Sequence, residues 1–261
     1  MKKFFLLLDR FTYLHIPKKL QAPREDLPRA LRYLPLLGLL CGLLLYLSTH
    51  LLAIMPASGA AAILLGVNLL LCGGKLLRPL MTAASGLTDE PLSAAGETGK
   101  KGFAGNPDNE KELIAKARRF RTSRSGLIWG GIWLLSLYFI YLVYLMSSSV
   151  SRFALIAAPV VCFWLMDWLV YYFHALPPAR LHLNFSRRDF IIASLLAMLS
   201  ILIFSSFPLY LSTLISFLGI YLFATYRVRT LGGLDEVSYS SACAWAQILF
   251  LLAWLVFARF I

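Results

Sequence analysis

Two neighbouring acids, Asp235 and Glu236, lie in a short polar connection between two long apolar spans. Carboxylate oxygens are the ligands that magnesium prefers, so such a pair could hold a metal ion and take part in catalysis. Paired acids in a polar connection are also commonly just solvated. Asp235 and Glu236 are therefore candidates for a metal site and for catalysis, and the sequence offers no better catalytic group.

A second group consists of four arginines and one hydroxyl that we expect at the cytoplasmic ends of helices. Arginine forms fork-shaped, charge-assisted hydrogen bonds with phosphate, and it needs no metal to do so. The same arginines could instead mark the cytoplasmic side and reach lipid headgroups. Both interpretations stay open for this set, which comprises Arg78, Ser123, Arg124, Arg227 and Arg229.

Other polar residues give weaker signals. Asp167 lies inside an apolar span, where an unpaired carboxylate is costly, so we expect it to pair with a neighbouring cytoplasmic arginine. Asn68 could hydrogen-bond another helix. The four histidines show no spacing of metal ligands. The four cysteines lie far apart and form no CxxC pair, which indicates small apolar residues; they are Cys41, Cys72, Cys162 and Cys243.

The composition indicates which elements must position these residues. The chain has 261 residues, of which 59% are hydrophobic, and a mean hydropathy of +0.71. A soluble core of this size cannot bury so much apolar surface. Spans of roughly 20 apolar residues match a bilayer core of about 30 Å. We predict an all-α, polytopic membrane protein with about seven transmembrane helices, near Tyr33–Met55, Gly59–Leu77, Leu127–Met146, Ser151–Phe173, Asp189–Phe207, Pro208–Tyr226 and Ser241–Ala258. The fifth and sixth could be a tight hairpin or one broken helix.

The basic residues predict the orientation in the membrane. With the N-terminus in the cytoplasm, every Lys and Arg except Arg152 and Arg259 falls on the inside. We therefore expect a bacterial cytoplasmic (inner) membrane protein with its motif-bearing loops on the cytoplasmic side. The net charge of +12 reflects this topology and contact with membrane lipids, and it is no argument for nucleic acid. The first ten residues are basic and then briefly apolar, which favours an uncleaved interfacial segment.

One connection is longer than the others. Residues 88–106 are rich in Gly, Ser and Ala and predict a flexible cytoplasmic loop. A basic amphipathic helix should follow, with Asn106 as its N-cap and Pro107 in its first turn. We treat residues 1–261 as a single membrane-embedded domain that includes this cytoplasmic segment, residues 88–125.

The stretch Cys72–Leu87, CGGKLLRPLMTAASGL, resembles a segment of the cobalamin synthase family (adenosylcobinamide-GDP ribazoletransferase, cobalamin 5'-phosphate synthase), which usually reads like TGGLHLDGLADTADGL. The glycines and leucines match. The family's three aspartates fall here on Arg78, Thr82 and Ser85. An arginine is always cationic and repels magnesium, so these residues cannot form the family's metal site.

Other segments, one before this stretch and three after it, also resemble the family and occur in the family's order. They are Leu34–Gly42, Phe120–Gly126, Ala158–Trp164 and Leu231–Ala244. Again charged residues are replaced: Thr122 and Val237 stand at aspartate positions, Ala244 at a glutamate position and Phe163 at an arginine position. The scaffold of the family is kept while its acids are missing together.

The resemblance implies a reaction of cobamide (vitamin B12) nucleotide-loop assembly at the cytoplasmic face. The family transfers adenosylcobinamide phosphate from adenosylcobinamide-GDP to alpha-ribazole or its 5'-phosphate, releases GMP and uses Mg²⁺. Its partners would be corrinoid and nucleotide substrates and other cobamide-assembly proteins. Because the carboxylates are replaced, we expect weak or no transferase activity and doubt a role for magnesium here, which makes the chain a pseudoenzyme candidate. The alternatives are a non-catalytic relative that binds corrinoid, nucleotide or a pathway partner, and an unrelated transporter-like membrane protein.

Overall fold

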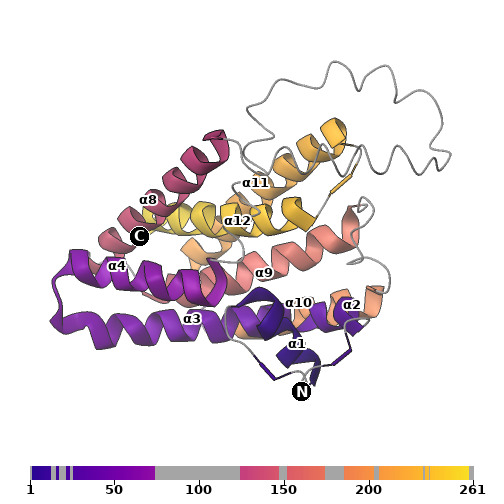
Figure 1. The fold of residues 1–261 in the computed structure, drawn as a ribbon, viewed down its shortest axis with the longest axis horizontal. Coiled ribbons are helices and arrows are strands. Elements are labelled where there is room, and N and C mark those ends of the chain that lie inside the picture. The colour runs from indigo at the N-terminus through magenta and orange to yellow at the C-terminus, as the bar shows by residue number, and fades with distance from the viewer. Residues whose placement is uncertain are drawn as a thin grey trace.

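This computed structural model describes residues 2–12, 16–17, 22–23, 26–73, 124–146, 152–173, 185–202, 206–231, 233–234 and 236–258. The elements in these ranges are helices, which pack into one bundle (Figure 1). Seven of them carry the architecture: α3 (Leu34–Leu51), α4 (Ala57–Asn68), α8 (Arg124–Met146), α9 (Ala154–Tyr172), α10 (Arg187–Leu202), α11 (Phe207–Leu231) and α12 (Glu236–Phe257).

Each of these seven helices falls on one of the predicted spans. Four helical stretches are long and apolar enough to cross a membrane, namely Leu27–Ile54, Ala154–Tyr172, Phe207–Thr230 and Ser238–Phe257. Shorter apolar stretches occur at Ala57–Leu71 and Gly131–Met146. The chain is an all-α membrane protein, as predicted.

Helices α9 and α10 are antiparallel neighbours. Near one end of the pair, Tyr171 stacks on Phe190 with ring centroids 4.7 Å apart. One to two turns further in, the Trp164 Nε1 group donates a hydrogen bond of 3.1 Å to the Ser194 hydroxyl. Higher residue numbers in α9 therefore meet lower numbers in α10, which is the arrangement of two consecutive spans.

Helix α11 runs parallel to α9 and so returns antiparallel to α10. Trp168 meets Phe217 with ring centroids 4.6 Å apart, and Phe173 meets Tyr221 at 6.4 Å. Helix α10 ends at Leu202 and α11 begins at Phe207. The fifth and sixth spans are thus two separate helices in a hairpin, and the alternative of one broken helix is wrong.

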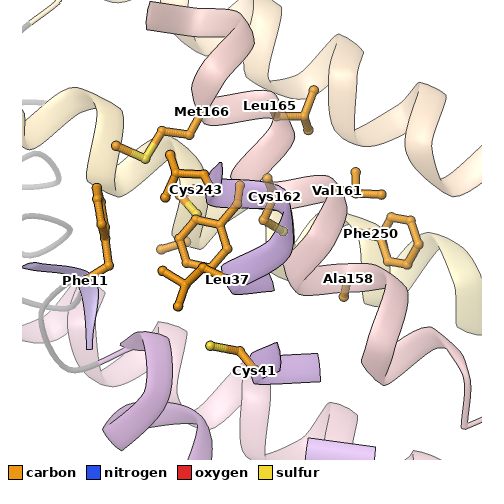
Figure 2. Packing of buried hydrophobic residues seen from close by; sticks show 14 of the residues in the cluster. Phe11, Leu37, Cys41, Ala158, Val161, Cys162, Leu165, Met166, Cys243 and Phe250 are labelled. Carbon is orange, nitrogen blue, oxygen red and sulfur yellow. The ribbon is translucent and has the colours of Figure 1, made fainter. Parts of the chain in front are cut away.

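Helix α9 lies at the centre of the bundle. Small side chains along it let α3 approach closely, and α12 covers another face. Figure 2 shows this core, in which buried residues from three helices meet: Leu37 and Cys41 of α3, Ala158, Val161 and Cys162 of α9, and Cys243 and Phe250 of α12. Cys41, Cys162 and Cys243 are free and buried, which confirms that they pack as small apolar residues.

Two helices extend beyond the predicted spans. Helix α11 continues from Tyr226 to Leu231, and α12 begins at Glu236 rather than at Ser241. Hydropathy places a boundary where polar residues begin, but here the helices continue through polar residues, of which Arg227 and Ser238 are buried. The Arg227 Nε group donates a hydrogen bond of 3.1 Å to the Ser238 hydroxyl across this joint.

The N-terminal segment forms α1 (Lys2–Phe11), an amphipathic helix as predicted, with Leu6, Leu7, Leu8 and Phe11 buried. It packs with α2 (Leu27–Ala30) and the 3-10 turn η3 (Leu31–Tyr33) at the start of α3 (Figure 1).

Helix α4 leads into the stretch Cys72–Leu87. Its end widens into a π-helical turn, η5 (Leu69–Gly73). The predicted loop and basic helix at residues 88–121 lie outside the described residues.

Candidate functional site

Basic side chains of the described residues gather at one end of the bundle. The first turns of α3, α10 and α12 and the last turns of α9 and α11 meet there, and we call this the basic end. It carries Arg32, Arg187, Arg188, Arg227 and Arg229. Arg152, by contrast, precedes α9 at the opposite end.

Two of the predicted phosphate-binding arginines lie on the last turns of α11. Arg227 is buried, with 6% of its surface exposed, and it donates to Ser238 of α12. Arg229 is exposed. The Ser238 hydroxyl holds the buried guanidinium of Arg227 in place, while the guanidinium of Arg229 is open to solvent and can bind an anion. This arrangement has the chemistry of an anion-binding surface.

The other predicted site residues are less fully described. Arg124 begins α8, and Glu236 begins α12. Arg78, Ser123 and Asp235 lie outside the described residues. The shared site of four arginines and the metal site at Asp235 and Glu236 both stay predictions.

Two positions at which the sequence resemblance places charged family residues are apolar and packed here. Phe163 is 1% exposed, and its ring meets that of Phe11 edge-on with centroids 6.0 Å apart. Ala244 is also 1% exposed, and its carbonyl oxygen accepts a hydrogen bond of 3.2 Å from Trp133 Nε1. Neither position supplies an oxygen to a metal. Within the described ranges, no three side chains of His, Cys, Asp or Glu gather as metal ligands. The doubt about magnesium stays a prediction, because Arg78, Thr82, Ser85 and Asp235 lie outside these ranges.

An ion pair at the basic end was not foreseen. Arg32 and Asp189 form it, with 3.3 Å between Nη1 and Oδ1. The other oxygen of Asp189 accepts hydrogen bonds from the Ser186 backbone N–H at 3.2 Å and its hydroxyl at 2.7 Å. Arg32 also donates to the Tyr33 hydroxyl at 2.8 Å. The only signal in the sequence was an acid in the first turn of a helix, which indicates a cap but no partner.

The interior of the bundle holds two further polar features. Gln247 Nε2 donates to Asn68 Oδ1 at 3.2 Å and to the Tyr141 hydroxyl at 3.4 Å, which confirms that Asn68 bonds another helix. Asp167 is fully buried, and neither of its oxygens has a hydrogen-bond partner among the described residues. The expected pairing of Asp167 with an arginine is therefore wrong for this part of the chain. The acid lies too deep in α9 to reach the arginines at the basic end.

Comparisons with known proteins identify the first third of the chain. Residues 3–87 match the family model of cobalamin-5-phosphate synthase. An adenosylcobinamide-GDP ribazoletransferase of Desulfitobacterium hafniense (strain Y51) is 36% identical over 88 residues, which are 33% of this chain and 35% of the relative. The match thus spans about a third of the length of that curated protein. No solved structure matches the chain.

The family match contains the stretch Cys72–Leu87 in which the acids are replaced. It ends at residue 87, so the resemblance of the later segments stays an interpretation of the sequence. The matched part includes α1, α3 and α4, which are the helices that lead into the altered stretch. Over residues 3–87, about a third of its length, the chain is thus similar to the cobalamin synthase family.

Proposed function

We propose that this chain serves cobamide nucleotide-loop assembly in the cytoplasmic membrane by binding a phosphate-bearing intermediate at its basic end, with weak or no transferase activity of its own. The similarity of residues 3–87 to the family supports a role in cobalamin biosynthesis. It also argues against an unrelated transporter-like protein. The matching relative is a ribazoletransferase by name, and that reaction is the one to test here.

The observation that carries the proposal is the placement of Arg227 and Arg229 on the last turns of α11. Arg227 is held against Ser238, and Arg229 projects from the surface one half-turn away. A pyrophosphate or nucleotide presents anionic oxygens, and an exposed guanidinium such as that of Arg229 binds them through charge-assisted hydrogen bonds. The joint between α11 and α12 also carries the segment Leu231–Ala244, which resembles a family motif.

The replaced charges support weak or absent chemistry. Displacement at a pyrophosphate needs positive charge on the attacked phosphorus and on the leaving phosphate, and the family uses magnesium for this. Phe163 and Ala244 are packed in the interior and give no ligand. Residual activity would require other acids, of which Asp235 and Glu236 are the candidates.

The activity test uses the full chain in liposomes with adenosylcobinamide-GDP, alpha-ribazole 5'-phosphate and MgCl₂. We expect no release of GMP above that of liposomes without protein. Clear turnover would refute the inactive interpretation. If that turnover is then lost in the Asp235→Ala, Glu236→Ala variant, these acids are the replacement ligands.

The binding test measures the affinity of the same liposomes for adenosylcobinamide-GDP without metal. Binding should weaken in Arg229→Ala and in the Arg78→Ala, Arg124→Ala variant. Arg152→Ala, which removes an arginine at the opposite end, is the matched control and should bind as well as the unmodified chain. Equal binding by all four proteins would rule out a phosphate site at the basic end.

A further inference from the structure

Asp167 is a carboxyl group deep inside the membrane bundle. It lies in α9, and its exposed fraction is 0%. Neither oxygen accepts a hydrogen bond from the described residues. An ionised carboxylate without partners is very unfavourable in such surroundings, far more so than a neutral acid. The group therefore needs either a bound cation or a proton.

The neighbours of Asp167 favour a proton. The Cys243 thiol of α12 is close enough to interact with it electrostatically, and Cys243 in turn interacts with Cys41 of α3 and Cys162 of α9. Figure 2 shows Cys243 near Met166, the residue next to Asp167 in α9. A hard cation such as Na⁺ or Mg²⁺ requires several oxygen ligands, whereas a thiol is only a weak donor and acceptor. In the described part of the chain, no set of three metal-ligating side chains surrounds the acid.

Asp167 also adjoins a row of buried polar side chains. Cys243 and Gln247 are four residues apart in α12, so they lie one above the other on the same helix face. Gln247 donates to Asn68 of α4 and to Tyr141 of α8. The Nδ2 atom of Asn68 is buried and has no partner among the described residues. Polar groups thus continue from the acid into the middle of the bundle across α12, α4 and α8.

We propose that Asp167 is a proton-binding site in the interior of the bundle, with the Cys243 thiol of α12 as a neighbour. The bound proton neutralises the carboxyl group and so allows it to remain in apolar surroundings. The site shares no residue with the phosphate-binding surface at the basic end. Its test can therefore fail or succeed without affecting the proposed function.

Infrared spectroscopy tests the proton directly. The full chain is reconstituted in lipid nanodiscs, and the C=O stretching band of a protonated carboxylic acid is compared between the unmodified chain and Asp167→Asn, a replacement of nearly equal size. We expect loss of the band in Asp167→Asn. Asp189→Asn is the matched control and should leave the band unchanged, because Asp189 is an ionised partner of Arg32. Superimposable spectra of the unmodified chain and Asp167→Asn would overturn the proposal.

A second measurement keeps the proposal testable if Asp167→Asn does not fold. Dicyclohexylcarbodiimide reacts with protonated acids in apolar surroundings: the acid proton passes to a reagent nitrogen, and the carboxyl group ends as a stable N-acylurea. Mass spectrometry of the unmodified chain should locate this adduct on Asp167, equally with and without NaCl or MgCl₂. Protection of Asp167 by either salt would identify a bound cation and overturn the assignment of a proton.

Discussion

Gly38 of α3 lies directly against the backbone of Pro159 in α9. A Cβ atom built on Gly38 would be 2.6 Å from the Pro159 carbonyl oxygen, and one built on Gly42, a turn further on, would be 2.6 Å from the Ile156 carbonyl oxygen. No side chain fits into these spaces. Close contacts between small residues are a main source of helix association in membranes. The glycine pair therefore sets how closely the first span approaches the central helix.

The first prediction concerns this contact. Gly38→Ala and Gly42→Ala should each lower the stability of the folded chain by about 1–3 kcal/mol, because the added methyl group must push α3 away from α9. The measurement is the midpoint of thermal unfolding in detergent. Gly66→Ala in α4 is the control, since a Cβ at Gly66 meets nothing within 4 Å. It should be neutral or gain up to about 1 kcal/mol from better helix propensity. Equal effects at all three glycines would contradict this prediction.

The sequence was sufficient to predict the seven helices, because hydropathy is a local pattern. It could not show which helix the glycines meet. The same limit applies to Asn68, for which a hydrogen bond was predicted without a partner; Gln247 lies 179 residues later in the chain. Partners so distant are determined by how the helices pack, and no local pattern encodes that.

The candidate site was predicted only in part. Arg227 and Arg229 were correctly placed near the end of a span, but the sequence did not distinguish the buried arginine from the exposed one. That difference arises because α11 and α12 continue past their predicted ends and pack against each other, which covers Arg227. Asp167 was recognised as unusual, but its lack of a partner depends on four surrounding helices.

The second prediction concerns the ion pair between Arg32 and Asp189. Asp189→Ala should cost about 2–3 kcal/mol, because it removes the acceptor of both Arg32 and Ser186 at a largely buried position. Arg32→Ala should cost less, since Ser186 still satisfies the carboxylate. A double-mutant cycle should give a coupling energy of about 1 kcal/mol. A coupling energy of zero would mean that the pair adds nothing to the folded state.

The pair between Lys3 and Asp26 is the matched control within the same chain. Its atoms are 3.4 Å apart, but 29% and 33% of the two side chains are exposed. Water screens such a pair, and surface ion pairs are commonly worth about 0–1 kcal/mol. Lys3→Ala should therefore change the unfolding midpoint much less than Asp189→Ala. A larger loss in Lys3→Ala would show that α1 depends on this contact.

The third prediction concerns the orientation in the membrane. Arg188 lies at the basic end and is exposed, whereas Arg152 lies at the opposite end. In a chain whose four native cysteines are replaced, we expect Arg152→Cys to react with a membrane-impermeant maleimide added to intact bacterial spheroplasts. Arg188→Cys should react only after the membrane is opened. The reverse pattern would place the basic end outside the cell and remove the basis for a cytoplasmic site.

The fourth prediction concerns Ala244, where replacement by the family's glutamate should disrupt the folded chain. Ala244 is 1% exposed and stands at a glutamate position of the family, packed beside Trp133. Ala244→Glu should lose about 3 kcal/mol or more, since the new carboxylate would be buried without a partner. Ala244→Ser is the control and should remain folded, because a serine hydroxyl in a helix can bond the carbonyl oxygen one turn before it. Both variants are compared by size-exclusion chromatography in detergent, and GMP release is measured on whatever remains folded. A folded Ala244→Glu variant that releases GMP would contradict this prediction. It would show that the interior can still form the family's site, and that the activity was lost only through the replaced side chains.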